Sequence, residues 1–199
     1  MLASGNPGKL RELAALLAPL HLELIAQAAL GIAPAEETGT SFRANAALKA
    51  RHCAARSGLA ALADDSGLEV DALGGRPGVW SARFAGAGAS DQQNLQRLLA
   101  ELEDVPDSAR QARYQCVIVC VRSATDPAPL IASGTWEGRI VRVAAGSGGF
   151  GYDPVFVPVG ETRTAAQLAP QAKNAVSHRA QALNALVAGL AREGYIAAP

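Results

Sequence analysis

Residues 112–122 are largely apolar, and this restricts the fold more than any other segment of the chain. In a β-strand, residues two apart share a face, so an alternating pattern shows what each face offers. One face would carry Tyr114, Cys116, Ile118 and Cys120, and the other Val117, Val119 and Val121. Because both faces are apolar, the pattern predicts a strand in the centre of a sheet.

Helical and strand patterns surround this segment. Asn6-Pro7 predicts the start of a helix over 8–18, and a second helix follows Thr40-Ser41. Ser90 and Gln93 form a capping box for a helix to about 103, and an amphipathic helix ends the chain. We expect strands at 59–63, 68–72, 129–143 and 154–159, a turn at Ser66-Gly67 and a loop over 74–90. The order of these helices and strands predicts an α/β fold. Because the sequence contains no repeat and no linker, we expect residues 1–199 to form one domain or two tightly joined lobes.

Composition excludes several classes of function. Lys plus Arg and Asp plus Glu both number 18, so net charge gives no reason to expect a polynucleotide or an anionic membrane as partner. No stretch of about 18 apolar residues without charge is present, so no membrane span is expected. The three cysteines have no zinc-site spacing, and their odd number argues against a disulfide framework. A reducing, cytoplasmic setting fits best.

Two acidic pairs stand out in a chain with few charges. Asp64 and Asp65 end an apolar run, and on an extended strand neighbouring side chains point to opposite faces, so the two carboxylates would have different roles. Glu36 and Glu37 precede a helix, where acids also complement the helix dipole. Two or three carboxylates together with water and phosphate oxygens would complete a magnesium shell.

Basic and glycine-rich segments offer further ligands, each with a plain structural alternative. The segment "SGNPGKL" is not a Walker loop; Ser4, Asn6 and Lys9 either face a phosphate or belong to an ordinary capped helix. The segment "GSGGFG" precedes a strand, so it is not a dinucleotide fingerprint; Phe150 and Tyr152 either stack on a base or pack in the core.

Two polar groups on helices also have two interpretations. A stripe at helical spacing either lines a site or faces water; it consists of Asn45, Lys49, His52 and Arg56. Lys173, His178 and Arg179 either donate to phosphate and base oxygens or form a polar helix end.

Five of these stretches together resemble one family. "SGNPGKLREL", "AEETGTSFRANAALKA", "ADDSGLEVDALGGRPGVWSARFAG", "GGFGYDPVF" and "KNAVSHRAQAL" are similar, in order and spacing, to the noncanonical purine nucleoside triphosphate pyrophosphatases, and most similar to the bacterial branch. The similarity runs from residue 2 to about 190. One departure is the start, where only Met1, Leu2 and Ala3 precede the first motif, so we expect a short first strand.

The resemblance implies an elongated mixed β-sheet with flanking helices and two lobes around an active-site cleft. It implies hydrolysis of dITP, ITP and XTP to the nucleoside monophosphate and pyrophosphate, with Mg²⁺, in a homodimer. Asp65 would be metal ligand and proton acceptor, and Glu36 a second metal ligand, with Glu37 the less favoured choice. Substrate contacts would come from Ser4, Gly5, Asn6, Pro7, Gly8, Lys9, Lys49, Ser66, Phe150, Gly151, Tyr152, Asp153, Lys173, His178 and Arg179.

Two other functions fit the same residues. Chemistry alone does not choose between attack at the α- and γ-phosphorus, so a nucleoside triphosphate phosphatase releasing orthophosphate is the first alternative. A nucleotide-binding regulator without turnover is the second. For the preferred function, selectivity would come from the 6-keto oxygen of hypoxanthine and xanthine, which accepts hydrogen bonds from His178 and Arg179 where adenine offers a donor.

Overall fold

A computed structural model describes residues 1–18 and 24–194 of the chain. Its residues fall into two compact units, each made of separate stretches of sequence. Unit 1 comprises Met1–Asp65, Cys116–Gly134 and His178–Pro199, and unit 2 comprises Ser66–Gln115 and Thr135–Ser177. The prediction that these are two lobes of one domain, with a cleft between them, stays a prediction.

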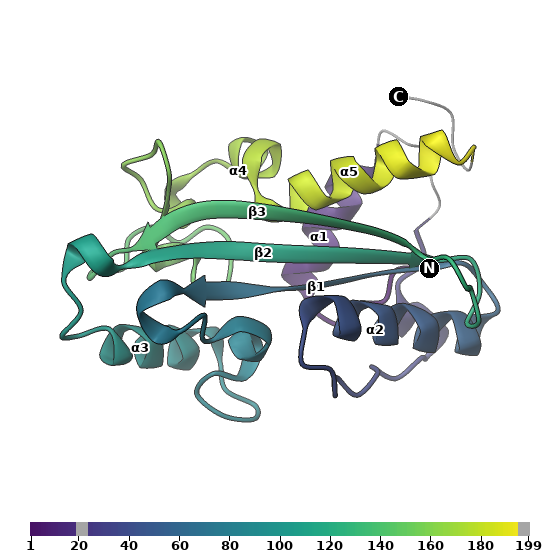
Figure 1. Ribbon diagram of the computed structural model, residues 1–199, viewed down its shortest axis with the longest axis horizontal. Helices are drawn as coiled ribbons and strands as arrows, with labels where there is room; N and C mark the ends of the chain where they lie inside the picture. Colours follow the sequence, from purple (N-terminus) through teal and green to yellow (C-terminus); the bar gives the residue numbers. More distant parts are fainter. Residues whose placement is uncertain (19–23, 195–199) are drawn as a thin grey trace. The chain divides into compact units, whose positions relative to one another are not determined.

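The described residues form helices around a four-stranded antiparallel sheet with the strand order β1-β2-β3-β4 (Figure 1). The strands are β1 (Ala61–Val70), β2 (Gln111–Val121), β3 (Leu130–Ile140) and β4 (Phe156–Pro158). The α-helices are α1 (Pro7–Leu17), α2 (Phe42–Ser57), α3 (Asp91–Glu101), α4 (Pro170–Val176) and α5 (His178–Arg192). The predicted α/β class and the inner position of 112–122 in the sheet are confirmed.

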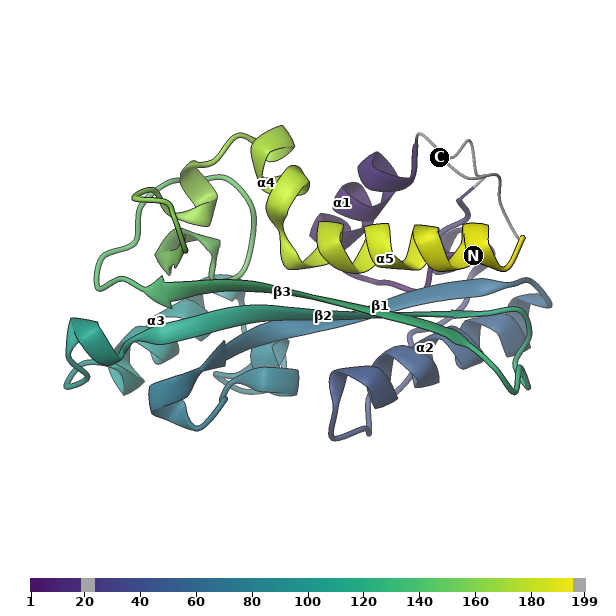
Figure 2. The same cartoon turned by 45° about the horizontal axis from the view of Figure 1, so that its top comes forward.

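Unit 1 covers both faces of its part of the sheet. Figures 1 and 2 show α2 on one face and α1 beside α5 on the other. On the α1 and α5 side, Cys116 and Ile118 join a core cluster with Leu13 and Leu183. On the α2 side, the alternate residues of β2 pack against small side chains of that helix, and this cluster includes Ala46, Ala50, Cys53, Val119 and Val121. The two apolar faces of β2 therefore have the partners that the sequence required.

Unit 2 has its own core, built around aromatic rings. The ring centroid of Phe156 in β4 lies 4.7 Å from that of Tyr114 and 5.4 Å from that of Trp136. A Cβ atom on Gly138 would come within 2.5 Å of the Val157 carbonyl oxygen and 2.6 Å of the Phe156 ring, so only glycine permits this approach of β4 to β3. Leu95, Leu98 and Leu102 of the α3 segment complete the core.

The expected helix boundaries are confirmed at several caps. Asn6 caps α1 with Pro7 in its first turn, Ser41 caps α2, and Ser90 with Gln93 forms the predicted capping box of α3. The expected turn at Ser66-Gly67 is wrong. β1 continues through both residues to Val70, because Gly67 keeps an extended backbone and the residues on either side stay in the sheet.

Among the described residues, the short strand expected before the first motif is reduced to isolated bridges at Leu2. Leu2 forms single parallel bridges to Ala26 and to Leu62, and these add a parallel component to the antiparallel sheet. Within residues 1–18 and 24–194, no helix is both long and apolar enough to cross a membrane.

Candidate active site

Asp64 and Asp65 lie inside β1, and their side chains leave the strand on opposite faces. Asp64 meets residues of α1 and α5, whereas Asp65 meets residues of α2. This division follows from the alternation of side chains along a strand, as predicted from the sequence. Both carboxylates are buried and both belong to unit 1.

On the first face, a chain of ion pairs surrounds Asp64. Lys9 Nζ lies 3.0 Å from Asp64 Oδ2, and Arg179 Nε lies 3.4 Å from the same oxygen. Arg179 also pairs with Glu12 of α1. Burial alone would raise the pKa of Asp64, but Lys9 and Arg179 outweigh it and hold the pKa of this carboxyl well below its usual range. Asp64 therefore stays ionised and ties α1, α5 and β1 together.

On the second face, two side chains of α2 hold Asp65. Lys49 Nζ donates to Asp65 Oδ1 at 3.0 Å and to Glu37 Oε1 at 2.8 Å. Asn45 Nδ2 donates to Asp65 Oδ2 at 3.2 Å. Each oxygen of Asp65 thus accepts a hydrogen bond from a different donor, and the carboxylate has a fixed orientation.

The pKa values of the two aspartates shift in opposite directions. Burial raises the pKa of Asp65, and Lys49 and Lys9 offset only part of that effect. Burial lowers the pKa of Lys49, but Asp65, Asp64 and Glu37 outweigh it, so the pKa of this lysine is raised and it stays protonated. A pair of neighbouring acids whose environments separate their pKa values is a common arrangement in acid–base sites.

The segment from Ser4 to Lys9 forms the start of α1. Asn6 Oδ1 accepts hydrogen bonds from the backbone N–H groups of Gly8 at 2.8 Å and Lys9 at 3.1 Å. The structural alternative, an ordinary N-cap, is therefore present. Gly5, Asn6 and Pro7 are exposed, whereas Lys9 reaches Asp64. Triphosphate binding by Ser4 to Lys9 stays a prediction.

The start of α5 lies unusually close to β3 within unit 1. A Cβ atom on Gly134 would come within 2.2 Å of the His178 carbonyl oxygen and 2.6 Å of the Ala182 nitrogen. Glycine at this position therefore permits the first turn of α5 to rest on the strand, and His178 and Arg179 become buried there. Their predicted contact with the purine base stays a prediction.

Unit 2 contains the remaining predicted site residues, including Ser66, the next residue of β1 after Asp65. Lys173 Nζ donates to Asp153 Oδ2 at 2.6 Å and lies 5.0 Å from the ring centroid of Phe150. The Phe150 N–H also donates to Asp153 Oδ2, at 2.9 Å. A Cβ atom on Gly149, whose φ is +70°, would sit 1.9 Å from that oxygen, so glycine is required beside this carboxylate.

The two aromatic residues of this loop have different environments. Tyr152 is buried in the core of unit 2, and its hydroxyl donates to the Ser81 carbonyl oxygen at 2.8 Å. Phe150 is only partly buried. The Gly151 N–H donates to Asp91 of α3 at 2.8 Å. The alternative of core packing thus holds for the Tyr152 ring, while base stacking by Phe150 stays a prediction.

The acids of unit 1 suit a magnesium ion by their chemistry. Mg²⁺ prefers oxygen ligands and is commonly bound through one or two carboxylates, with water and phosphate oxygens completing its shell. Asp65 and Glu37 converge on the same ammonium group of Lys49, while Glu36 is exposed one residue away. Among the described residues, no group of three or more His, Cys, Asp or Glu side chains forms a complete metal site. The two-carboxylate arrangement fits Mg²⁺ that binds together with a nucleotide.

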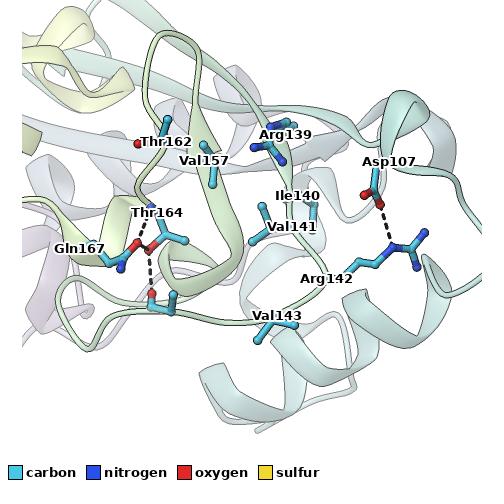
Figure 3. Close-up of a pocket in the computed structure, with 11 residues that line it drawn as sticks. Asp107, Arg139, Ile140, Val141, Arg142, Val143, Val157, Thr162, Thr164 and Gln167 are labelled. Carbon is cyan, nitrogen blue, oxygen red and sulfur yellow. Dashed lines mark hydrogen bonds and ion pairs between the residues drawn. The ribbon is translucent and has the colours of Figure 1, made fainter.

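Unit 2 also contains a cavity of about 310 Å³ that none of the predicted site residues line (Figure 3). Its apolar wall includes Ile140, Val141 and Val157, and Arg142 at its edge is paired with Asp107 at 2.7 Å. Thr164 and Gln167 line the side of the cavity opposite Arg142, and the Thr164 N–H donates to Gln167 Oε1 at 2.9 Å (Figure 3). Its lining thus contains no pair of carboxylates and no lysine of the kind found around Asp65.

Two residues that take part in the contacts around Asp64 and Asp65, Asn45 and Glu12, were not predicted as site residues from the sequence. Asn45 was one member of a polar stripe with an open role, although it lies one helical turn before Lys49 and therefore shares its face. Glu12 lies three residues after Lys9 on α1, at the spacing that places side chains side by side. Its partner Arg179 is far away in the sequence, so no local signal could have predicted the pair.

Comparison with known proteins agrees with the resemblance. The Ham1 family model matches residues 1–189. A protein named dITP/XTP pyrophosphatase from Salmonella paratyphi A is 56% identical over 190 residues, which are 96% of each chain. The protein of that name from Escherichia coli K12 is 55% identical over the same share of each chain.

Solved structures match the fold as well. A HAM1 protein from Coxiella burnetii is 49% identical and superposes with a TM-score of 0.88 over 96% of this chain and 97% of its own. A structure titled nucleoside-triphosphatase / dITP/XTP pyrophosphatase, from Mycobacterium abscessus, is 46% identical, with a TM-score of 0.74 over 93% of this chain and 96% of its own. With the family model matched along nearly the whole sequence, the chain belongs to the Ham1 family.

Proposed function

We propose that this protein hydrolyses noncanonical purine nucleoside triphosphates, namely dITP, ITP and XTP, to the nucleoside monophosphate and pyrophosphate. Relatives that match 96% of the chain are named dITP/XTP pyrophosphatase. The observation that carries the proposal is Asp65, a buried carboxylate that Lys49 and Asn45 hold by one oxygen each. An oriented carboxylate beside the protonated Lys49 suits proton removal from water next to a phosphate.

In the proposed reaction, the oxygen of a water molecule forms a bond to the α-phosphorus. The bond between that phosphorus and the oxygen bridging to the β-phosphorus breaks, and pyrophosphate leaves. Asp65 accepts the proton that the water loses. Lys9 and Lys49 stabilise the negative charge that accumulates on the phosphate oxygens, and their ion pairs with Asp64 and Asp65 place them before the substrate arrives.

Magnesium is the proposed cofactor, held by Asp65 together with Glu36 or Glu37. When bound, the ion would neutralise phosphate oxygens and lower the pKa of a coordinated water. Excess EDTA should then abolish pyrophosphate release, and added Mg²⁺ should restore it. Activity that persists in EDTA would contradict the cofactor assignment.

Selectivity for the base is proposed to arise from hydrogen-bond donors at the start of α5. The 6-keto oxygen of hypoxanthine and xanthine accepts hydrogen bonds, whereas the 6-amino group of adenine donates them. His178 and Arg179 are the proposed donors. A site built on such bonds can discriminate by about 10⁴-fold or more. An unchanged ratio of kcat/KM for dITP and dATP in His178→Ala would contradict this role.

Assembly and location complete the proposal. We propose a homodimer in the cytoplasm, as the family resemblance implies. The free cysteines Cys53, Cys116 and Cys120 are consistent with a reducing compartment. Sedimentation equilibrium of the purified protein tests the dimer, and a mass equal to one chain at micromolar concentration would contradict it.

The central experiment identifies the products. The protein is incubated with dITP and Mg²⁺ in water enriched in ¹⁸O, and the products are separated and their masses measured by mass spectrometry. Attack at the α-phosphorus gives pyrophosphate plus dIMP that carries the label. Labelled orthophosphate plus dIDP would instead indicate a phosphatase, and binding of dITP without any product would indicate a regulator. The Asp65→Asn variant, under the same conditions, is the matched control for contaminating phosphatases.

A further inference from the structure

Asn45 connects the loop before α2 to Asp65 on β1. Its side chain is fully buried, and it is the fourth residue of α2. The Oδ1 atom accepts a hydrogen bond from the Gly39 N–H at 2.8 Å, and Nδ2 donates to Asp65 Oδ2 at 3.2 Å. One amide therefore binds both the loop before α2 and the carboxylate on β1.

The contact with the loop depends on glycine. A Cβ atom on Gly39 would lie 2.6 Å from Asn45 Oδ1 and 2.8 Å from the Ala44 Cβ, so any side chain would push the loop away from the helix. Glu36 and Glu37 lie on this loop, three and two residues before Gly39 respectively. Asn45 thus sets the distance between the loop acids and Asp65.

A neutral amide suits this position better than a charged donor. The N–H group of Asn45 stabilises the ionised carboxylate through a charge-assisted hydrogen bond. It adds no charge to a cluster in which Lys49 already serves Asp65 and Glu37. Because Lys49 holds Oδ1 and Asn45 holds Oδ2, the carboxylate cannot rotate without losing a buried bond.

We propose that Asn45 is a positioning residue for the hydrolytic reaction, which it serves by fixing the orientation of Asp65 and the place of the Glu36–Glu37 loop. This inference rests on the proposed function, in which Asp65 accepts the proton of the attacking water. A displacement of about 1 Å at a reacting group can reduce the rate by about 10²-fold. Asn45 therefore governs kcat more than substrate binding.

Unit 2 contains a closely matched asparagine without such a carboxylate. Asn94 occupies the fourth position after its serine cap in α3, as Asn45 does in α2. Its Oδ1 atom accepts from the Ala85 N–H at 2.8 Å, and its Nδ2 atom donates to the Ala82 carbonyl oxygen at 3.2 Å. Asn94 is also buried. The two residues differ in what Nδ2 meets, a carboxylate in one case and a backbone carbonyl in the other.

The experiment compares Asn45→Asp with Asn94→Asp. Each substitution keeps the shape and the acceptor of the side chain and removes the Nδ2 donor. Both variants are measured for kcat and KM with dITP and Mg²⁺, and for the urea midpoint of unfolding. We expect the urea midpoint of both variants to fall. For Asn45→Asp, kcat should fall by about 10- to 100-fold, while KM stays within about threefold of the wild-type value. For Asn94→Asp, kcat should stay within about twofold of the wild-type value. Asn45→Ala, which adds no charge, should show the same loss of kcat.

The outcomes separate this proposal from the proposed function. A kcat of Asn45→Asp and Asn45→Ala within about twofold of wild type would overturn the positioning role alone. An equal loss of kcat in Asn94→Asp would overturn it too, because a purely structural effect would then explain both. Failure of both Asn45 variants to fold, while Asn94→Asp folds, would identify Asn45 as a determinant of the fold and overturn the proposal. A wild-type protein that releases no pyrophosphate would overturn the proposed function itself.

Discussion

The charged side chains of the candidate site are organised differently in unit 1 and unit 2. Unit 1 holds two sets of charged groups, one on each face of β1. Asp64 and Glu12 pair with Lys9 and Arg179 on one face, and Asp65 and Glu37 pair with Lys49 on the other. In unit 2, Lys173 and Asp153 form a buried ion pair. Asp65 and Glu37 both pair with the ammonium group of Lys49, whereas in unit 2 Asp153 pairs with Lys173.

The charged side chains of the two units are therefore suited to different chemistry. Two neighbouring carboxylates offer the oxygen ligands that a divalent ion such as Mg²⁺ prefers, and Asp65 and Glu37 in unit 1 are such a pair. The pair in unit 2 instead holds the glycine-rich loop through the Phe150 N–H and the Phe150 ring. We infer that unit 1 carries the reactive groups and that unit 2 shapes a binding loop.

The largest effect is expected for Asp65→Asn in unit 1. The amide cannot accept the proton of the attacking water, so kcat should fall by about 10²- to 10⁴-fold. The side chain keeps its size, and dITP should still bind when Mg²⁺ is removed with EDTA. Steady-state kinetics and isothermal titration with dITP measure the two effects. A kcat near that of the wild type would contradict the role of Asp65 as proton acceptor.

The corresponding change in unit 2 is the control for this prediction. Asp153→Asn removes the charge that holds Lys173 and loosens the loop at Phe150. If unit 2 only shapes a binding loop, KM for dITP should rise and kcat should fall less than in Asp65→Asn. A larger loss of kcat in Asp153→Asn would reverse the comparison between the units.

The second prediction concerns stability and the fully buried carboxylate of Asp64. In Asp64→Asn, Lys9 and Arg179 lose the charge that they share, and removing one partner of a buried ion pair costs about 3–5 kcal/mol. Urea unfolding at pH 7 measures the free energy of unfolding. A loss below about 1 kcal/mol would place this network among weak surface pairs.

The wild-type protein and Asp64→Asn also test the lowered pKa of Asp64, through the pH dependence of their stability. Because the pKa of Asp64 is lower in the folded state than in the unfolded state, the carboxylate stabilises the fold above its unfolded pKa of about 4. That contribution is lost as the pH falls toward the folded pKa. The difference in unfolding free energy between wild type and Asp64→Asn should therefore shrink between about pH 5 and pH 2. A difference that does not change with pH would contradict the lowered pKa.

A third, smaller effect on stability is expected when the unit 2 pair is broken. Lys173→Met leaves Asp153 buried with the Phe150 N–H as a remaining donor, so the loss should lie near the lower end of the range, about 3 kcal/mol. Urea unfolding measures it. The double variant Lys173→Met/Asp153→Asn removes both charges and should recover part of the loss. No recovery would show that shape rather than charge pairing holds this loop.

The fold was predictable where signals were local. Helix caps at Asn6, Ser41 and Ser90 and the two apolar faces of β2 are short-range patterns, and the structure has them at the expected places. The turn at Ser66-Gly67 was wrong because glycine after serine favours a turn locally, whereas pairing within the sheet keeps the strand extended to Val70. Long-range contacts outweighed the local preference.

The candidate site was predictable only in part for the same reason. The opposite directions of Asp64 and Asp65 follow from strand alternation alone. Their partners do not, since Arg179 reaches Asp64 across 115 positions of the sequence and Asn45 reaches Asp65 across 20. The resemblance to a family marked Arg179 as a substrate residue, but only the structure reveals that its guanidinium also ties α5 to Glu12 and Asp64.

The smallest effect is expected for Glu161→Gln, which breaks a pair of exposed side chains in unit 2. Arg163 Nη2 lies 3.0 Å from Glu161 Oε1, and the side chains are 55% and 34% exposed. Water screens such a pair, and ordering two mobile side chains offsets most of the attraction, so the loss should stay below about 1 kcal/mol. Urea unfolding beside Lys173→Met compares an exposed and a buried pair in the same unit. If both variants lost the same free energy of unfolding, burial would not decide the strength of these pairs. The buried ion pairs of Asp64 would then have no reason to be stronger than ion pairs on the surface.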